Sequence, residues 1–184
     1  MKDYLIKYMT SEGLDSARLL NDDFIEAIRV LFQAGLYVSA TKLLMSFIDS
    51  LGYLEDDSGS GGEAFKGWLD RNVELAVLGI SAEELWEHRN SILHMTNLNS
   101  RKVSAGKTRR LVAYIGILPP NSPTGDAEAK WLDLSGLIKA VILGCDKMLA
   151  RLNANPDSFA SFFKRYDEIV SDVRYQKIEI WRDG

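Results

Sequence analysis

Apolar residues recur at intervals of three and four along most of the chain, which is the spacing of helices that bury one face. The segments that show this pattern are 14–35, 37–54, 63–79, 81–98, 136–152 and 157–173. The strongest prediction is 81–98, because Ser81 and Glu84 have the spacing of a capping box and acidic residues fill the first turns. The pattern predicts a mainly α protein, a bundle of about five or six helices.

Two short segments depart from the helical pattern. Residues 111–118, LVAYIGIL, are rich in β-forming side chains and stop at two prolines, and residues 130–134, KWLDL, could supply a strand that pairs with them. Together they suggest a small β-hairpin inserted before the last two helices. The tail 174–181 alternates polar and apolar residues, which suits either an edge strand or an ordered arm.

The length of 184 residues suits one domain with its own core and is short for two. We therefore treat residues 1–184 as a single domain. Its parts are a helical region at 16–98, a basic loop with the expected hairpin at 99–134, and C-terminal helices with a tail at 135–184.

Charge and cysteine content narrow the class of protein. The formal net charge of −4 argues against coating nucleic acid through bulk charge, but it leaves room for a local basic cleft. The single cysteine, Cys145, cannot form an internal disulfide, and its apolar neighbours predict a buried helix residue. The N-terminus lacks a signal-peptide pattern, and no apolar run reaches the roughly 18 residues of a membrane span. We expect a cytoplasmic protein with no membrane partner.

Polar chemistry concentrates in residues 84–95, ELWEHRNSILHM, which contain both histidines of the chain. Arg89 and His94 stand five apart, about 140° of rotation on an α-helix, whereas Asn90 and His94 share one face. The long Arg89 side chain can still swing toward the groove that Asn90 and His94 line. Histidine transfers protons near neutral pH, and the arginine fork matches phosphate oxygens. These groups suit RNA cleavage by the ribose 2′-hydroxyl, without a metal or another cofactor.

Residues near this segment have a functional and an ordinary interpretation. Asp49, in the helix predicted at 37–54, either orients Arg89 or His94 or is a surface acid. The basic segment 99–110 follows the motif helix, and it either steers RNA phosphates or is a solvated loop. Its cations are Arg101, Lys102, Lys107, Arg109 and Arg110.

Three other patterns favour ordinary structure over a further binding site. The stretch SAGKT at 104–108 is no phosphate-binding loop, because Arg101 stands where that motif needs a glycine. Glu84 and His88, four apart, could pair on the helix surface. A zinc site is not expected, since His88 and His94 lie on different faces and have no cysteine partner.

Arg89 and His94, with polar Asn90 and three further residues between them, resemble the signature of the HEPN superfamily. That signature is an arginine, commonly followed by a polar residue, and a histidine after four to six intervening residues. The resemblance covers roughly residues 16–98, where two helices joined by a loose loop precede the motif. It implies a HEPN-like helical bundle that dimerises so that both motifs meet in one cleft.

The resemblance also implies a function. Many HEPN proteins are metal-independent ribonucleases of toxin–antitoxin, phage-defence or RNA-processing systems. In that scheme Arg89 contacts the scissile phosphate, His94 transfers a proton and Asn90 assists. Our first hypothesis is thus a homodimeric endoribonuclease for single-stranded or loop RNA, with an antitoxin protein as a further potential partner. The second is an inactive HEPN-like module for dimerisation or for binding a nucleotide or protein. The third is a structural helical protein in which Arg89 and His94 only satisfy each other or the backbone.

Overall fold

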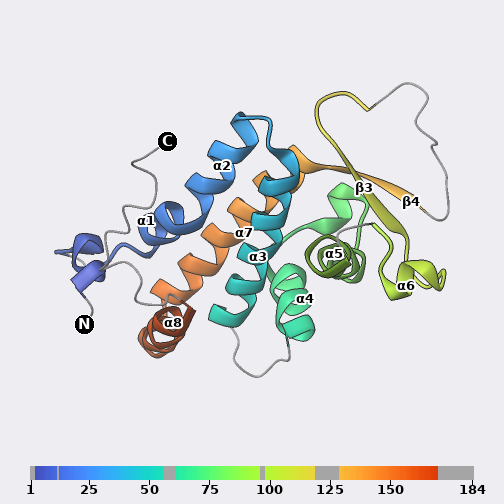
Figure 1. Ribbon diagram of the computed structural model, residues 1–184. Helices are drawn as coiled ribbons and strands as arrows, with labels where there is room; N and C mark the ends of the chain where they lie inside the picture. Colours follow the sequence, from blue (N-terminus) through green and yellow to red (C-terminus); the bar gives the residue numbers. More distant parts are fainter. Residues whose placement is uncertain (1–2, 12, 56–60, 96–97, 119–128, 170–184) are drawn as a thin grey trace.

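The computed structural model describes residues 3–11, 13–55, 61–95, 98–118 and 129–169 (Figure 1). The main helices are α1 (Ser16–Leu20), α2 (Glu26–Gln33), α3 (Tyr37–Glu55), α4 (Gly61–Asn72), α5 (Ala82–Asn90), α6 (Arg101–Ser104), α7 (Leu134–Asn153) and α8 (Pro156–Ile169). Tighter 3-10 turns are η1 (Asp3–Tyr8) and η3 (Leu75–Leu78), and wider π-helical turns are η2 (Asn21–Ile25) and η4 (Ser91–Met95). The strands are β1 (Met9–Thr10), β2 (Gly13–Leu14), β3 (Arg110–Tyr114) and β4 (Ala129–Asp133). The prediction of a mainly helical bundle with a small β component is confirmed.

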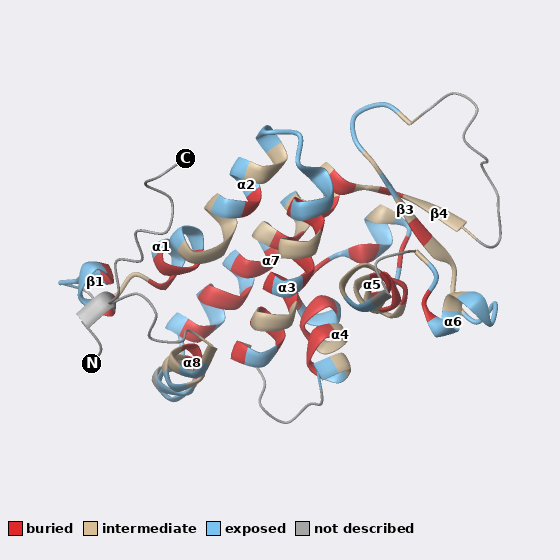
Figure 2. Cartoon of the chain, viewed as in Figure 1, coloured by how far each residue is buried: buried red, intermediate tan, exposed pale blue. Residues whose placement is uncertain are grey.

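Helix α3 is the centre of the bundle, and it packs against α2, α4, α7 and α8 (Figure 1). Its inward face is apolar at helical spacing, and Figure 2 shows the buried residues of α3, α4 and α7 turned toward one another. Gly52 allows α3 to approach α4 closely, because a Cβ there would lie 2.7 Å from the carbonyl oxygen of Ala64. The predicted burial of Cys145 in α7 is confirmed, and burial raises the pKa of its thiol to about 12. Among the helices described, none is long and apolar enough to cross a bilayer.

The two inserted strands form where the sequence predicts them, but they are not a hairpin. β3 and β4 pair in parallel, with Val112 opposite Trp131. β4 leads directly into α7, where Asp133 accepts a hydrogen bond from the Ser135 amide at 3.0 Å. The packing of α7 in the core therefore sets the direction of β4, which local pattern does not specify. The antiparallel strand pair is β1 with β2, near the N-terminus. The tail 174–181 lies outside the described residues.

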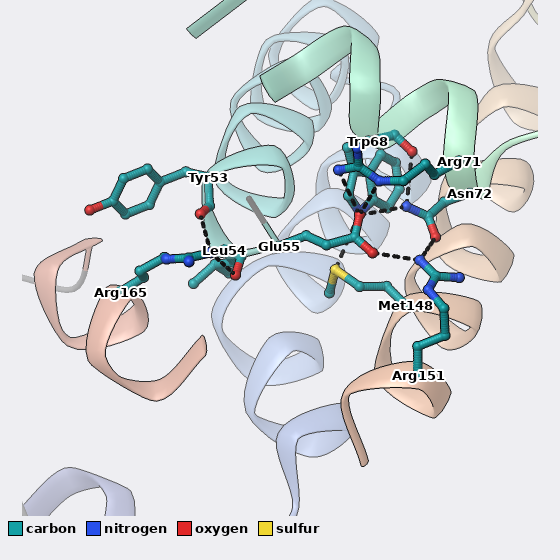
Figure 3. A network of polar contacts seen from close by, with 9 residues as sticks. All are labelled: Tyr53, Leu54, Glu55, Trp68, Arg71, Asn72, Met148, Arg151 and Arg165. Atoms are coloured by element: carbon teal, nitrogen blue, oxygen red, sulfur yellow. Dashed lines mark hydrogen bonds and ion pairs between the residues drawn. The ribbon is translucent and has the colours of Figure 1, made fainter. Parts of the chain in front are cut away.

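A buried polar network joins the ends of α3, α4 and α7 (Figure 3). Asn72 is 2% exposed, and its amide donates to the Glu55 carboxylate at 3.0 Å and to the Trp68 carbonyl at 2.9 Å. Arg151 donates to Glu55 at 2.5 Å and also to the Asn72 side-chain oxygen. Nε of Arg71 also donates a hydrogen bond to the Glu55 carboxylate, at 3.2 Å. Loss of the buried asparagine would remove one donor from the half-buried Glu55 carboxylate and one acceptor from Arg151.

Asn72→Ala is therefore expected to lower the free energy of unfolding by about 2 kcal/mol, within the range for an unsatisfied buried polar group. Urea denaturation measures this change in the free energy of unfolding. The matched control variant is Arg71→Ala. The Arg71 side chain is 42% exposed, and its ion pair with Glu55 should contribute less than about 1 kcal/mol to the free energy of unfolding. Equal losses of unfolding free energy in the two variants would show that the stability of the network does not depend on the buried Asn72.

Candidate functional site

The motif helix α5 begins as the sequence predicts. The Ser81 hydroxyl accepts a hydrogen bond from the Glu84 amide at 3.2 Å, and the Glu84 carboxylate accepts one from the Ser81 amide at 2.8 Å. Past Asn90 the helix widens into the π turn η4. Ser91, fully buried at this junction, donates its hydroxyl proton to the Glu87 carbonyl at 2.8 Å. Such a bond to the preceding turn bends helices.

The π turn determines how the motif residues face one another. Residues five apart on an α-helix differ by about 140°, so Arg89 and His94 were not expected to share a narrow stripe. The π turn η4, which begins at Ser91, is wider than an α turn and reduces this separation. Nη1 of Arg89 lies 2.6 Å from Nε2 of His94. The expectation that the long Arg89 side chain reaches toward His94 is confirmed.

The guanidinium of Arg89 is held from several sides. Oδ2 of Asp49, on α3, lies 2.8 Å from both Nε and Nη2, and the Asn90 side-chain oxygen accepts from Nη1 at 3.1 Å. The Trp86 ring centroid lies 5.0 Å from the guanidinium carbon, a cation–π contact. Burial raises the pKa of the Asp49 carboxyl, and the hydrogen bond from Arg89 opposes that rise. Asp49 therefore acts on the motif through Arg89, one of the two partners considered from the sequence.

His94 stands at the open side of this cluster and is exposed. Arginine has no acceptor atom, so Nε2 of His94 must accept the hydrogen bond from Arg89. The arrangement places a group able to accept a proton directly beside a fixed cation.

His88 has a different environment. It is 5% exposed, and its buried Nε2 has no hydrogen-bond partner among the residues described. Burial lowers the pKa of His88 to about 4, which keeps the ring neutral at physiological pH. The surface pair with Glu84 considered above is wrong, because Glu84 is itself buried and is engaged by Ser81 and Arg109.

The basic segment lies along the first half of α5. Lys102 pairs with Glu83 and lies 3.7 Å from Glu87, and Arg109 pairs with Glu84. Three of its five predicted cations line a cleft of about 910 Å³, namely Lys107, Arg109 and Arg110. Of the four motif and supporting residues (Asp49, Arg89, Asn90 and His94), none lines this cleft. The structure thus brings together the predicted catalytic residues, and it brings most of the basic segment together elsewhere.

The SAGKT stretch has the geometry of a helix end. Gly106, at φ +65°, closes α6, its amide donates to the Val103 carbonyl at 3.0 Å, and the Lys107 amide donates to the Lys102 carbonyl at 2.9 Å. These amides are engaged within the cap, so they cannot cradle a phosphate. The structure agrees with the exclusion made from the spacing.

Sequence reasoning missed two residues that shape the site. Trp86 stands three before Arg89, a spacing at which side chains meet on a helix, and that signal could have found the cation–π contact. Ser91 gave no comparable signal, since its role depends on the π turn. The described part of the chain contains no cluster of three or more histidine, cysteine, aspartate or glutamate side chains arranged to hold a metal ion.

Comparison of the chain with protein-family models, curated proteins and solved structures gives no match.

Proposed function

We propose that this protein is a metal-independent, HEPN-type endoribonuclease that cleaves single-stranded or loop RNA as a homodimer. The observation that carries the proposal is the 2.6 Å contact between Arg89 and His94, with His94 open to solvent. The resemblance of the motif to the HEPN signature supplies the dimer and the RNA substrate, and the cysteine content and N-terminal pattern favour a cytoplasmic setting. It also supplies the biological role, which is a toxin–antitoxin or phage-defence system with an antitoxin protein as a partner.

The chemistry that these residues support is transesterification at phosphorus. Nε2 of His94 accepts the proton of the 2′-hydroxyl, the O2′–P bond forms, and the P–O5′ bond breaks. Arg89 binds the non-bridging oxygens, where charge accumulates. The departing O5′ takes a proton from a protonated His94 of the second copy or from water, which leaves a 2′,3′-cyclic phosphate and a 5′-hydroxyl.

Substrate binding has to rearrange the free site. Nη1 of Arg89 and Nε2 of His94 are hydrogen-bonded to each other, so a phosphate that draws Nη1 to itself frees Nε2 to act as the base. Asp49 keeps its contacts with Nε and Nη2 on the other edge of the guanidinium. Asp49 is thus a positioning residue, and Asn90 assists from the Nη1 edge.

The test is a cleavage assay with end-labelled single-stranded RNA in EDTA. The expected products carry 2′,3′-cyclic phosphate ends, and a fully 2′-O-methylated RNA of the same sequence stays intact because its nucleophile is blocked. Cleavage of the methylated strand, or activity that EDTA abolishes, would contradict the proposed chemistry. Light scattering on the same sample should give the mass of a dimer.

A second candidate is a catalytically inactive HEPN-like module for dimerisation or for binding a nucleotide or protein. It is favoured by the engagement of Arg89 with three protein acceptors, Asp49, Asn90 and His94. A folded dimer that binds RNA or a nucleotide but cuts no RNA would select it.

A further inference from the structure

The cleft of about 910 Å³ lies between the start of α5, the turn before it, and the segment from α6 to β3. Figure 1 shows these elements together on the side of the molecule opposite α1 and α8. The volume is that of a small-molecule site. Glu84 lines the cleft, and Arg89 stands five residues further along the α-helix. Because that spacing is about 140° of rotation, the cleft and the Arg89–His94 pair face different sides of α5.

The carboxylates of this cleft are neutralised by cations of the surrounding elements. Glu83 lies 3.2 Å from the ammonium of Lys66 and pairs with Lys102, and Glu84 pairs with Arg109. The hydrogen bond from Lys102 holds the pKa of Glu83 below its usual range. These two acids therefore present little uncompensated negative charge to the cleft.

Two further cations of the cleft are not neutralised by a carboxylate. Neither Lys107 nor Arg110 has an ion-pair partner in the part of the chain that the structure describes, and both line the cleft. Nε of Arg110 is buried, with no hydrogen-bond acceptor among the described residues. A buried donor without a partner is unfavourable, and more so when it is charged. The cleft lining therefore carries two cations whose charge no carboxylate of the described residues balances, which favours an anion there.

We propose that this cleft binds a phosphate group, with Arg110 and Lys107 as its ligands. Phosphate accepts several charge-assisted hydrogen bonds at once, which suits a guanidinium beside an ammonium. Among the described lining residues none is aromatic, so a base has no stacking partner there. Recognition therefore runs through the phosphate, which either a nucleic-acid backbone or a small phosphate compound can supply. The site does not depend on RNA cleavage at Arg89 and His94.

The experiment measures binding of a labelled, fully 2′-O-methylated oligouridylate by fluorescence anisotropy at several salt concentrations, with unlabelled pyrophosphate as the competing probe. Lys107→Ala and Arg110→Gln are each expected to weaken binding about tenfold and to lower the salt slope by about one. The matched control is Arg101→Ala, which removes the same charge from an exposed residue of α6 outside the cleft lining. It should change affinity less than about threefold. Circular dichroism confirms that each variant is folded.

Displacement of the oligonucleotide by pyrophosphate, lost in both cleft variants, would support a site for any phosphate group. Binding of the oligonucleotide without displacement would support the nucleic-acid backbone as the source. Equal losses in Arg101→Ala and the cleft variants would overturn the proposal in favour of diffuse surface charge. Wild-type affinity in a folded Arg110→Gln variant, or no binding of either probe, would also overturn it. Displacement by pyrophosphate is measured without any cleavage of RNA, so failure of this site and failure of the ribonuclease proposal give different results.

Discussion

His94→Ala is expected to lower the rate of RNA cleavage at least about 100-fold, because a positioned proton-transfer group contributes about 10²–10⁴-fold. Arg89→Ala should cause a loss of similar size, since it removes the contact to phosphate and the hydrogen bond that orients His94. Arg89→Lys should recover little activity, because one ammonium cannot bind Asp49 through two donors and also reach Nε2 of His94. Initial rates with labelled RNA measure all three.

Two further variants distinguish a direct effect on RNA cleavage from a general loss of structure. Lys139→Ala changes an exposed cation of α7 far along the chain from the motif and should cut at the wild-type rate. Asp49→Asn should lower the rate less than Arg89→Ala does, since the amide retains one acceptor for Arg89. Cleavage by His94→Ala at the wild-type rate would place the chemistry elsewhere in the protein. Thermal melting of each variant checks that a lost rate is not lost folding.

The second large effect concerns acid stability. Burial lowers the pKa of His88 from 6.5 to about 4 in the folded protein. As pH falls through 6.5 the unfolded chain binds a proton at His88 while the folded protein does not, so the free energy of unfolding falls with pH until about 4. The shift corresponds to about 3 kcal/mol over this range. Stability is thus fully present above pH 6.5 and is lost progressively below it.

Urea denaturation between pH 7 and pH 4 tests this in wild type and in His88→Leu. Carboxylates also titrate in this range, so the informative quantity is the difference between the two proteins. His88→Leu should lose less stability on acidification, by about 3 kcal/mol. Parallel profiles for wild type and His88→Leu would mean that His88 is protonated in the folded protein at acid pH.

Local pattern was sufficient for the helices and for the motif. The capping box at Ser81 and Glu84 marks the start of α5 because its two hydrogen bonds join residues three apart. The apolar spacing marks α3 and α7 because one face of each must be buried. The positions of both inserted strands followed from their β-forming side chains, but their parallel pairing did not. Relative strand direction depends on where α7 packs, which no short segment encodes.

By itself, the sequence determined a mainly helical chain with Arg89, Asn90 and His94 on one helix, because such properties depend on residues a few positions apart. Only the structure showed the π turn η4 between Arg89 and His94 and the direct contact of their side chains. It also decided the contact from Asp49, which lies forty residues earlier in the chain. Packing also decided the partners of two cations of the basic segment, because Lys102 and Arg109 bind carboxylates of α5 that folding brings near.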